Sequence, residues 1–290
     1  IRFKMSIGLN ISRFVTALAA EATSAAEVIT GSAGSETGTD VGTVIRQSFL
    51  DNGLWGKIIQ GVKQYQAWHY AVFILFWLII IFVPYFIGSF NFAIITSKRL
   101  YHDDIRKYGS KNAGLTNMYR VYGKKGAIYT LIGDSLKGMI CAVIGYVFLG
   151  YTGAYAASFF CIIGHMFPIY YKFQGGKGVL TAAGALLLLD PPIFLILFAI
   201  FAIIALSTKY VSLASIMSMM LYPLILSRLR GNGAPVIFAF LIAVSVVFMH
   251  RSNIKRLWNG EETKFSFKQK TNDAADSNGP ARDKPEKKRR

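Results

Sequence analysis

Long uncharged stretches alternate with short basic segments through most of the chain. Asp, Glu, Lys and Arg are all absent from 64–97, 138–171, 178–189, 191–208, 210–227 and 231–250. A transmembrane helix needs about 20 mostly apolar residues, whereas the apolar run of a buried soluble helix is about 10–14 residues long. Because several such stretches follow one another, the pattern predicts an all-α, polytopic membrane protein and disfavours a soluble protein with a very apolar core.

The apolar stretches divide into about seven predicted transmembrane helices. Gly150 and Gly153 interrupt one over-long run, and the Asp-Pro-Pro sequence at 190–192 separates two others, because proline ends a preceding helix. The first helix is long and contains Pro84 and Gly88, so it is either one kinked helix or two. The fourth is short, at about 14 residues, and can start in a loop buried by protein. The expected spans are 69–97, 127–149, 153–171, 177–190, 192–208, 211–228 and 234–250.

The positive charge of the chain lies outside these stretches. The formal net charge is +17, yet charged residues make up only 16% of the chain, against about a quarter in soluble domains. The loop at 98–126 holds eight basic residues and a basic tail begins at Arg251, whereas the loops of the opposite side hold only Arg230. Because Lys and Arg concentrate in cytoplasmic loops, we expect an outside amino terminus, a cytoplasmic carboxyl terminus and a location in the cell membrane. The charge then meets anionic membrane lipids, and no nucleic-acid partner is expected.

The two ends differ from the membrane domain, which we expect at 69–262. Residues 1–68 form an extension whose apolar spacing predicts interfacial amphipathic helices, and the apolar run before Glu21 is too short for a signal peptide. Residues 263–290 are polar and basic, and we expect them to be disordered. Cys141 and Cys161 lie inside apolar stretches, which predicts buried thiols rather than a disulfide or a metal site. Neither a metal nor a cofactor is expected.

Small and polar residues crowd the basic loop at 109–120. Glycines let a backbone approach a ligand closely, and successive N–H groups can form an anion-binding nest. An arginine at the end of the loop can bind phosphate through two hydrogen bonds. The loop therefore predicts a phosphate site, although an ordinary glycine-containing basic loop has the same composition. Its candidate residues are Ser110, Asn112, Thr116, Asn117 and Arg120.

A glycine-rich turn on the same predicted side opens the fourth span. Unpaired N–H groups at a helix N-terminus point outward and attract anions, and a lysine adds a point charge. The alternative is a flexible turn with a membrane-anchoring lysine. The candidate residues are Gly175, Gly176, Lys177 and Gly178.

Two residue pairs complete the candidates. His250 and Asn253 are three positions apart at the end of the last span, so they share a helix face, although this pair could also be an interfacial anchor. Asp134 and Lys137 have the same spacing inside the second span. Ionisable residues within membrane segments are functional suspects and usually pair, but an ion pair that supports the first loop is an equally good interpretation.

These segments together resemble the acyl-phosphate-dependent glycerol-3-phosphate acyltransferases of bacterial phospholipid synthesis. The resemblance runs from about Val83 to Glu262 and includes the segments at 88–89, 104–120, 134–138, 164–168, 173–179, 209–215 and 250–254. It implies a seven-helix membrane fold with the site on the cytoplasmic side. The chain departs from the family pattern at Lys111, Leu115 and Ser252, where the family usually has Gly, Ala and Glu.

The resemblance also implies roles for the candidate residues. Ser110, Arg120 and His250 correspond to catalytic residues, Asp104 to a supporting residue, and Lys177, its neighbouring glycines, Ser212 and Asn253 to the phosphate pocket. The implied reaction moves a fatty acyl group from acyl phosphate to the 1-hydroxyl of glycerol 3-phosphate. Acyl phosphate arrives activated, so positioning and charge neutralisation can suffice. The alternative function is a transporter or channel for an anionic solute that uses the same basic loops.

Overall fold

The computed structural model describes residues 66–265, and the regular elements among these residues are helices, without a strand. The predicted extension at 1–68 and the predicted tail therefore lie almost wholly outside the described residues. The all-α prediction is confirmed. The α-helices are α4 (Gln66–Gly88), α5 (Phe92–Tyr101), α6 (Leu115–Met166), α7 (Val179–Leu189), α8 (Pro191–Thr208), α9 (Val211–Arg230), α10 (Ala234–Met249) and α11 (Arg251–Trp258), with short 3-10 turns at Ile105–Lys107 and Ile169–Tyr171.

The first predicted span consists of two helices. Pro84 lies inside α4 and does not end it. The break comes at Gly88, and α5 starts after Asn91, whose side-chain oxygen accepts a hydrogen bond from the N–H of Ile94 at 3.1 Å. Such a cap satisfies one of the free N–H groups of a helix start, so the sequence after the break specifies a new helix.

Helix α6 contains the second and third predicted spans as a hairpin. Gly150 has φ 59° and ψ −149°, and Leu149 before it is also outside the helical region. A positive φ favours glycine, which explains why the chain turns at this position. A second irregularity lies at Gly123, with φ 71°. The third span ends at Met166, five residues earlier than expected, because Pro168 follows it.

Asp190 and Pro191 separate α7 from α8, as predicted, and α7 has only 11 residues. Among the described residues, four helices are long and apolar enough to cross a membrane, or five if α10 and α11, bent by 57°, form one span. With α6 divided at Gly150, and without the short α5 that ends in Lys98 and Arg99, the apolar helical segments from 66 to 249 number seven. How many of them cross the membrane stays a prediction.

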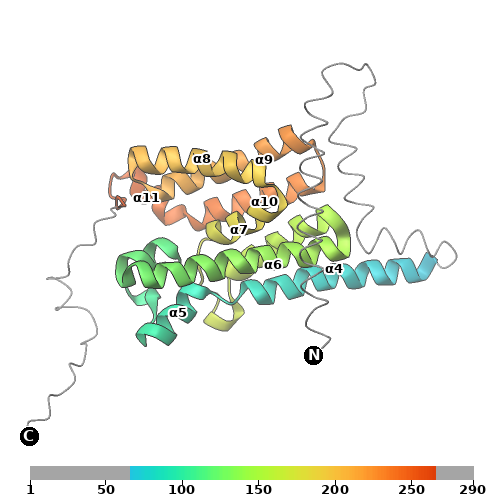
Figure 1. Ribbon diagram of the computed structural model, residues 1–290, viewed down its shortest axis with the longest axis horizontal. Coiled ribbons are helices and arrows are strands. Elements are labelled where there is room, and N and C mark those ends of the chain that lie inside the picture. Colours follow the sequence, from blue (N-terminus) through green and yellow to red (C-terminus); the bar gives the residue numbers. More distant parts are fainter. Residues whose placement is uncertain (1–65, 266–290) are drawn as a thin grey trace, which may run out of the picture.

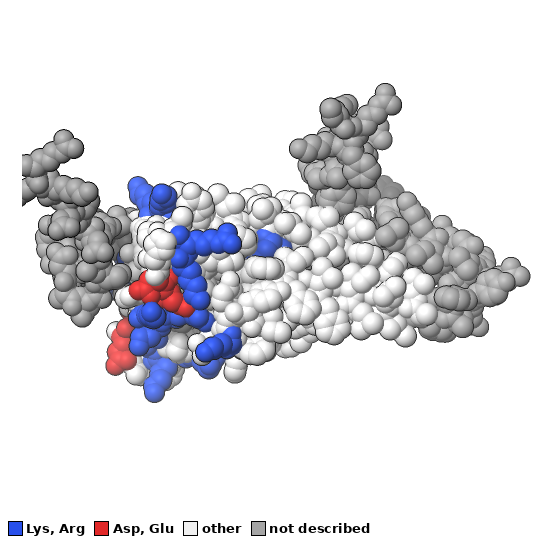
Figure 2. All heavy atoms as spheres, turned by 90° about the horizontal axis from the view of Figure 1, so that it is seen from below, with Lys and Arg blue, Asp and Glu red and all other residues white. Residues whose placement is uncertain are grey.

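The helices lie side by side, with α8 and α9 on one side of the bundle, α4 and α6 on the other and α7 between them (Figure 1). Large apolar side chains face outward, such as Leu195 and Ile237, which are 61% and 62% exposed, while Asp134 and His165 are buried. Such an arrangement is typical of a membrane protein. On the face shown in Figure 2, Lys, Arg, Asp and Glu gather at the end of the bundle that carries α5 and α11.

A buried polar cluster closes the opposite end of the bundle. Asp190 is fully buried and accepts hydrogen bonds from Arg230 Nε at 2.7 Å, from the Tyr155 hydroxyl at 2.5 Å and from the Tyr151 hydroxyl. These partners come from the turn of α6 and the end of α9. The cluster, called the Asp190 cluster below, therefore fastens three helix ends together.

Candidate active site

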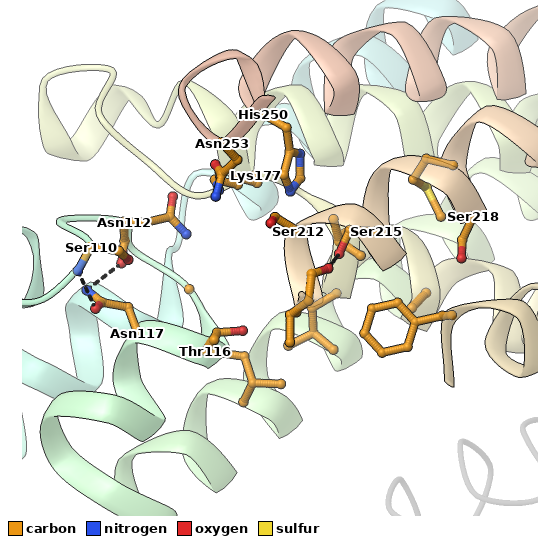
Figure 3. A pocket seen from close by; sticks show the side chains of 18 of the residues that line it. Ser110, Asn112, Thr116, Asn117, Lys177, Ser212, Ser215, Ser218, His250 and Asn253 are labelled. Carbon is orange, nitrogen blue, oxygen red and sulfur yellow. Dashed lines mark hydrogen bonds between the residues drawn. The ribbon is translucent and has the colours of Figure 1, made fainter. Parts of the chain in front are cut away.

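A cavity of about 720 Å³ lies at the charged end of the bundle. Residues from all three predicted clusters line it, and their side chains converge from separate elements (Figure 3). The predicted residues that line it are Ser110, Asn112, Thr116, Asn117, Arg120, Lys177, Ser212, His250 and Asn253. The other predicted residues do not line the cavity and can act only through their neighbours. They are Gly175, Gly176, Gly178, Asp104, Asp134 and Lys137.

Asn117 shapes the first loop. Its side-chain nitrogen donates to the carbonyl oxygens of Tyr108 and Asn112, both at 3.0 Å, and its oxygen accepts from the N–H of Ser110 at 2.9 Å (Figure 3). The amide is thus occupied by the loop backbone, which it folds so that the Ser110 side chain faces the cavity. This geometry favours a supporting role over the predicted phosphate contact.

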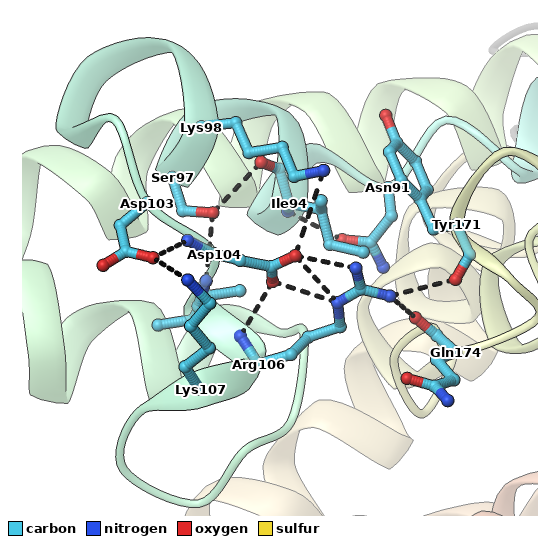
Figure 4. A network of polar contacts seen from close by, with 11 residues as sticks. Asn91, Ile94, Ser97, Lys98, Asp103, Asp104, Arg106, Lys107, Tyr171 and Gln174 are labelled. Carbon is cyan, nitrogen blue, oxygen red and sulfur yellow. Dashed lines mark hydrogen bonds and ion pairs between the residues drawn. The ribbon is translucent and has the colours of Figure 1, made fainter.

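A charged clamp connects the first loop to the glycine turn. Asp104 pairs with the Arg106 guanidinium at 2.7 Å, and Arg106 also donates to the carbonyl oxygens of Tyr171 at 2.9 Å and Gln174 at 3.1 Å (Figure 4). Hydrogen bonds from Arg106 hold the pKa of Asp104 below its ordinary value, as expected for a paired carboxylate. Asp104 therefore has a supporting position, as the resemblance implied.

The glycine turn is built differently from the predicted anion nest. The N–H groups of Gly175 and Gly176 donate to the carbonyl oxygens of Met166 and His165, both at 3.1 Å. These two amides are therefore not free to bind an anion, which corrects the role predicted for both glycines. A Cβ atom at Gly176 would collide with the ring of His165 and lie 2.5 Å from the Ala113 carbonyl oxygen, so glycine is needed here for close packing.

The start of α7 supplies the N–H groups instead. Gly178 is the residue before the helix, and the N–H of Ala182 makes the first hydrogen bond of the turn, to Gly178 O at 2.9 Å. The N–H groups of Val179, Leu180 and Thr181 precede it and have no acceptor within the helix. Val179, Leu180 and Lys177 line the cavity. The helix start that could bind an anion thus lies at Val179, two residues after the predicted start at 177.

Asp134 and Lys137 form a buried ion pair with an N–O distance of 2.8 Å. Lys137 donates to the carbonyl oxygens of Gly88 and Phe90, both at 2.9 Å, and Asp134 accepts from the N–H of Phe92 at 3.3 Å. The pair thus holds the break between α4 and α5. This arrangement supports the structural interpretation of the pair rather than a catalytic one.

His250 enters the cavity with a defined ring orientation. Its Nδ1 lies 2.8 Å from the carbonyl oxygen of Val246, and a carbonyl oxygen can only accept, so Nδ1 carries the hydrogen. In the neutral ring Nε2 then keeps its lone pair. The ring points toward the space between Lys177 and Ser212 (Figure 3). Nε2 is placed to accept a hydrogen bond from a substrate hydroxyl.

Glu262 lines the cavity, although the sequence interpretation did not single it out. Its carboxylate accepts hydrogen bonds from Ser212 Oγ at 2.7 Å, Asn253 Nδ2 at 2.6 Å and Arg256 Nε at 2.7 Å. Asn253 in turn accepts from Lys177 Nζ. Arg256 was also missed, although its three-residue spacing from Asn253 on α11 was a usable signal. The position of Glu262 depends on the chain folding back after α11.

The residues after Glu262 pack on the bundle. The N–H of Phe265 donates to Lys209 O at 2.7 Å, and Arg120 donates to the carbonyl oxygen of Thr263 at 3.3 Å. The boundary predicted at 262 between the domain and its tail is therefore too early, because 263–265 belong to the packed structure.

The electrostatics of the cavity favour anions. Of the charged residues that line it, Lys111, Arg120, Lys177 and Arg256 are cations and only Glu262 is a carboxylate. Burial lowers the pKa of Lys177 to about 8, while the charge of Glu262 opposes this shift. Burial alone would raise the pKa of Glu262, but its three hydrogen bonds lower it below the ordinary value.

An apolar arm continues the cavity away from the cations. Leu131 of α6 and Phe198 of α8 line this arm and are 43% and 54% exposed. Other apolar residues of the arm are Leu180, Leu186, Phe194, Leu197, Phe201 and Met219.

The fold and the cavity define a membrane protein whose cavity joins a cationic part to an apolar part. The family model described as glycerol-3-phosphate acyltransferase matches residues 78–260. Among curated proteins, a glycerol-3-phosphate acyltransferase of Finegoldia magna is 44% identical over 194 residues, which cover 66% of this chain and 97% of that protein. One of Syntrophotalea carbinolica is 42% identical over 191 residues, which cover 64% and 96%.

The comparison with solved structures leads to the same family. The chain resembles the crystal structure of PlsY (YgiH), an integral membrane glycerol 3-phosphate acyltransferase, in its glycerol 3-phosphate form, with a TM-score of 0.62 and 34% identity over 65% of this chain and 95% of that one. The lysophosphatidic acid form gives a TM-score of 0.60 and 32% identity over the same shares. The chain belongs to the glycerol-3-phosphate acyltransferase family. The prediction of an acyltransferase, rather than a transporter, is confirmed.

Proposed function

We propose that the protein transfers a fatty acyl group from acyl phosphate to the 1-hydroxyl of glycerol 3-phosphate, releasing lysophosphatidic acid and phosphate, at the cytoplasmic face of the cell membrane. The observation that carries this proposal is the shape of the cavity. Its cationic head and its apolar arm are continuous, so a phosphorylated headgroup and a fatty chain can bind together. Related proteins named glycerol-3-phosphate acyltransferase support the choice of acceptor.

Two phosphoryl groups would share the cationic head. Arg120 and Lys177, with the first turn of α7, offer charge-assisted hydrogen bonds to phosphoryl oxygens. Ser110, Asn112 and Thr116 of the first loop and Ser212 and Asn253 of the opposite wall add neutral donors. Positioning and charge neutralisation in a partly buried site lower the barrier to acyl transfer.

In the transfer step, the hydroxyl oxygen of the acceptor attacks the acyl carbonyl carbon. The bond from that carbon to the phosphate oxygen breaks, and phosphate leaves with the electron pair. His250 Nε2 accepts the hydrogen bond of the attacking hydroxyl and orients it, and the acceptor's own phosphate takes up the proton. Because acyl phosphate is a mixed anhydride, the chain need not supply a covalent nucleophile.

The membrane orientation follows from charge. Four basic residues line the cavity, and basic residues gather at one end of the bundle (Figure 2). Such residues concentrate on the cytoplasmic side. Anionic lipids would surround this end, which would also receive glycerol 3-phosphate from the cytoplasm.

The test is a transfer assay with purified protein in detergent. Palmitoyl phosphate and labelled glycerol 3-phosphate should give labelled lysophosphatidic acid without any sealed compartment, and palmitoyl-CoA should not replace palmitoyl phosphate. Product from palmitoyl-CoA at a similar rate would contradict the proposed donor.

A further inference from the structure

His165 lines the cavity, yet the chemistry proposed above does not use it. It stands one residue before the end of α6, and its side chain is 4% exposed. Two carbonyl groups at this helix end, those of His165 and Met166, hold the glycine turn. The imidazole therefore lies directly beneath the turn that carries Lys177.

Lys137 fixes the hydrogen of this imidazole. Its Nζ lies 2.8 Å from His165 Nδ1 and is also held by Asp134, Gly88 and Phe90. An ammonium group has three hydrogens and no lone pair. Lys137 has four such neighbours for its three hydrogens, so two of them share one hydrogen. In every arrangement, a ring nitrogen that faces the ammonium group can only accept a hydrogen bond. Asp134 Oδ1 lies 3.4 Å from Nδ1, farther than the ammonium group at 2.8 Å, so the ammonium group decides the tautomer. Nδ1 is therefore unprotonated, and the neutral ring carries its hydrogen on Nε2.

Nε2 points to the place where the two phosphate-binding segments meet. A Cβ atom at Gly176 would collide with Nε2 while lying 2.5 Å from the carbonyl oxygen of Ala113. Within residues 66–265, the buried side-chain polar atoms that lack a partner are the hydroxyls of Tyr122 and Thr181. Nε2 forms no hydrogen bond with another described residue. It differs from these two buried hydroxyls because His165 lines the cavity.

We propose that the Nε2–H group of His165 donates a hydrogen bond to an oxygen of a phosphoryl group bound between the first loop and the glycine turn. His165 is then a substrate-binding residue whose tautomer is set by Lys137, and the Asp134–Lys137 pair acts on substrate through it. The inference rests on the proposed phosphoryl site. Either substrate can supply the phosphoryl group, so the test must separate the two.

Two amide substitutions separate the roles of the two ring nitrogens. In His165→Asn the amide reaches the position of Nδ1, which keeps an acceptor for Lys137 and removes the donor from the cavity. In His165→Gln the amide reaches the position of Nε2, which keeps the donor and loses the contact with Lys137. We expect His165→Asn to raise KM at least tenfold for glycerol 3-phosphate or for palmitoyl phosphate, and the substrate affected identifies the phosphoryl group.

His165→Gln, which keeps the donor but loses the contact with Lys137, should raise the same KM at least threefold less than His165→Asn does. The reverse order, with Gln impaired and Asn close to wild type, would show that the ring only supports Lys137. Equal losses in both variants would also overturn the proposal. Wild-type turnover, measured in the same assay, tests the proposed function separately.

A second measurement needs no variant at position 165. In protein labelled with ¹⁵N-histidine, the resonances of His165 are assigned by replacing the other three histidines one at a time. The protonated nitrogen should be Nε2, and its resonance should shift when glycerol 3-phosphate or a non-transferable acyl phosphonate is added. A proton on Nδ1, or resonances that neither ligand moves, would contradict the inference.

Discussion

Within residues 66–265, the buried Asp190 cluster and the cavity lie at opposite ends of the bundle, and they differ in charge balance. In the Asp190 cluster, one carboxylate is bonded to one guanidinium and two tyrosine hydroxyls. In the cavity, four cations face a single carboxylate, Glu262. The same kinds of side chain thus close one end and leave a positive surplus at the other. The surplus is what an anionic substrate can neutralise.

The comparison separates structural charge from functional charge. Removing one member of a fully hydrogen-bonded, buried ion pair destabilises the fold, because the charge of the other member is left uncompensated. A cation kept in surplus, with a pKa shifted by burial, marks a site of binding or catalysis. Substitutions at the two ends should therefore fail in different ways.

Removing a cavity cation should have the largest effect on turnover. We expect Arg120→Ala and Lys177→Ala each to lower kcat/KM about 1,000-fold, because each removes charge stabilisation in a partly buried site, worth about 3–4 kcal/mol. Palmitoyl phosphate transfer measures the loss. Lys124→Ala is the matched control, because Lys124 is an exposed lysine near the same loop but outside the cavity lining. Wild-type rates in both cavity variants would refute the assigned roles.

Removing Asp190 should instead reduce stability. Asp190→Ala removes the buried carboxylate that Arg230 Nε and two tyrosine hydroxyls contact, and breaking a buried ion pair costs about 3 kcal/mol in the free energy of unfolding, while kcat per folded molecule should stay near wild type. Reversible unfolding in mixed detergent measures the change. Arg230→Ala should also destabilise the fold, and the exposed Arg228 provides its control as Arg228→Ala. A large loss of kcat with unchanged stability would remove the distinction between the two ends.

The pKa of Lys177 predicts a smaller, pH-dependent effect. Lys177 is charged below its pKa of about 8 and neutral above it, so attraction for phosphoryl groups is lost as pH rises. We expect kcat/KM, which reports the free enzyme, to fall about tenfold per pH unit above this value. Lys177→Arg should abolish the fall, because arginine stays charged. The same pH break in both proteins would assign it to another group.

Glu262→Gln should have the smallest effect. The charge of Glu262 raises the pKa of Lys177, so its removal should lower that pKa and move the break in the pH profile to lower pH. The amide still offers an oxygen to Ser212 and Asn253. A shift toward higher pH would contradict the coupling between these two groups.

The sequence predicted the apolar helices and the convergence of the three clusters, because loops that alternate along a helical bundle meet at one end. Asp190 and Pro191 located a helix boundary through local chemistry alone. The amides of Gly175 and Gly176 could not be predicted, because their acceptors lie on the neighbouring helix end. Glu262 and the packed residues after it were missed for the same reason, since a polar tail gains its position only through tertiary contacts.

The central claim is that one cavity holds two phosphoryl groups at the same time. Equilibrium binding of labelled glycerol 3-phosphate, measured with and without a saturating non-transferable acyl phosphonate, tests it most directly. We predict that glycerol 3-phosphate binds in the presence of the phosphonate and that Lys177→Ala weakens this binding. Complete exclusion of glycerol 3-phosphate by the phosphonate would show a single phosphoryl site and contradict the account.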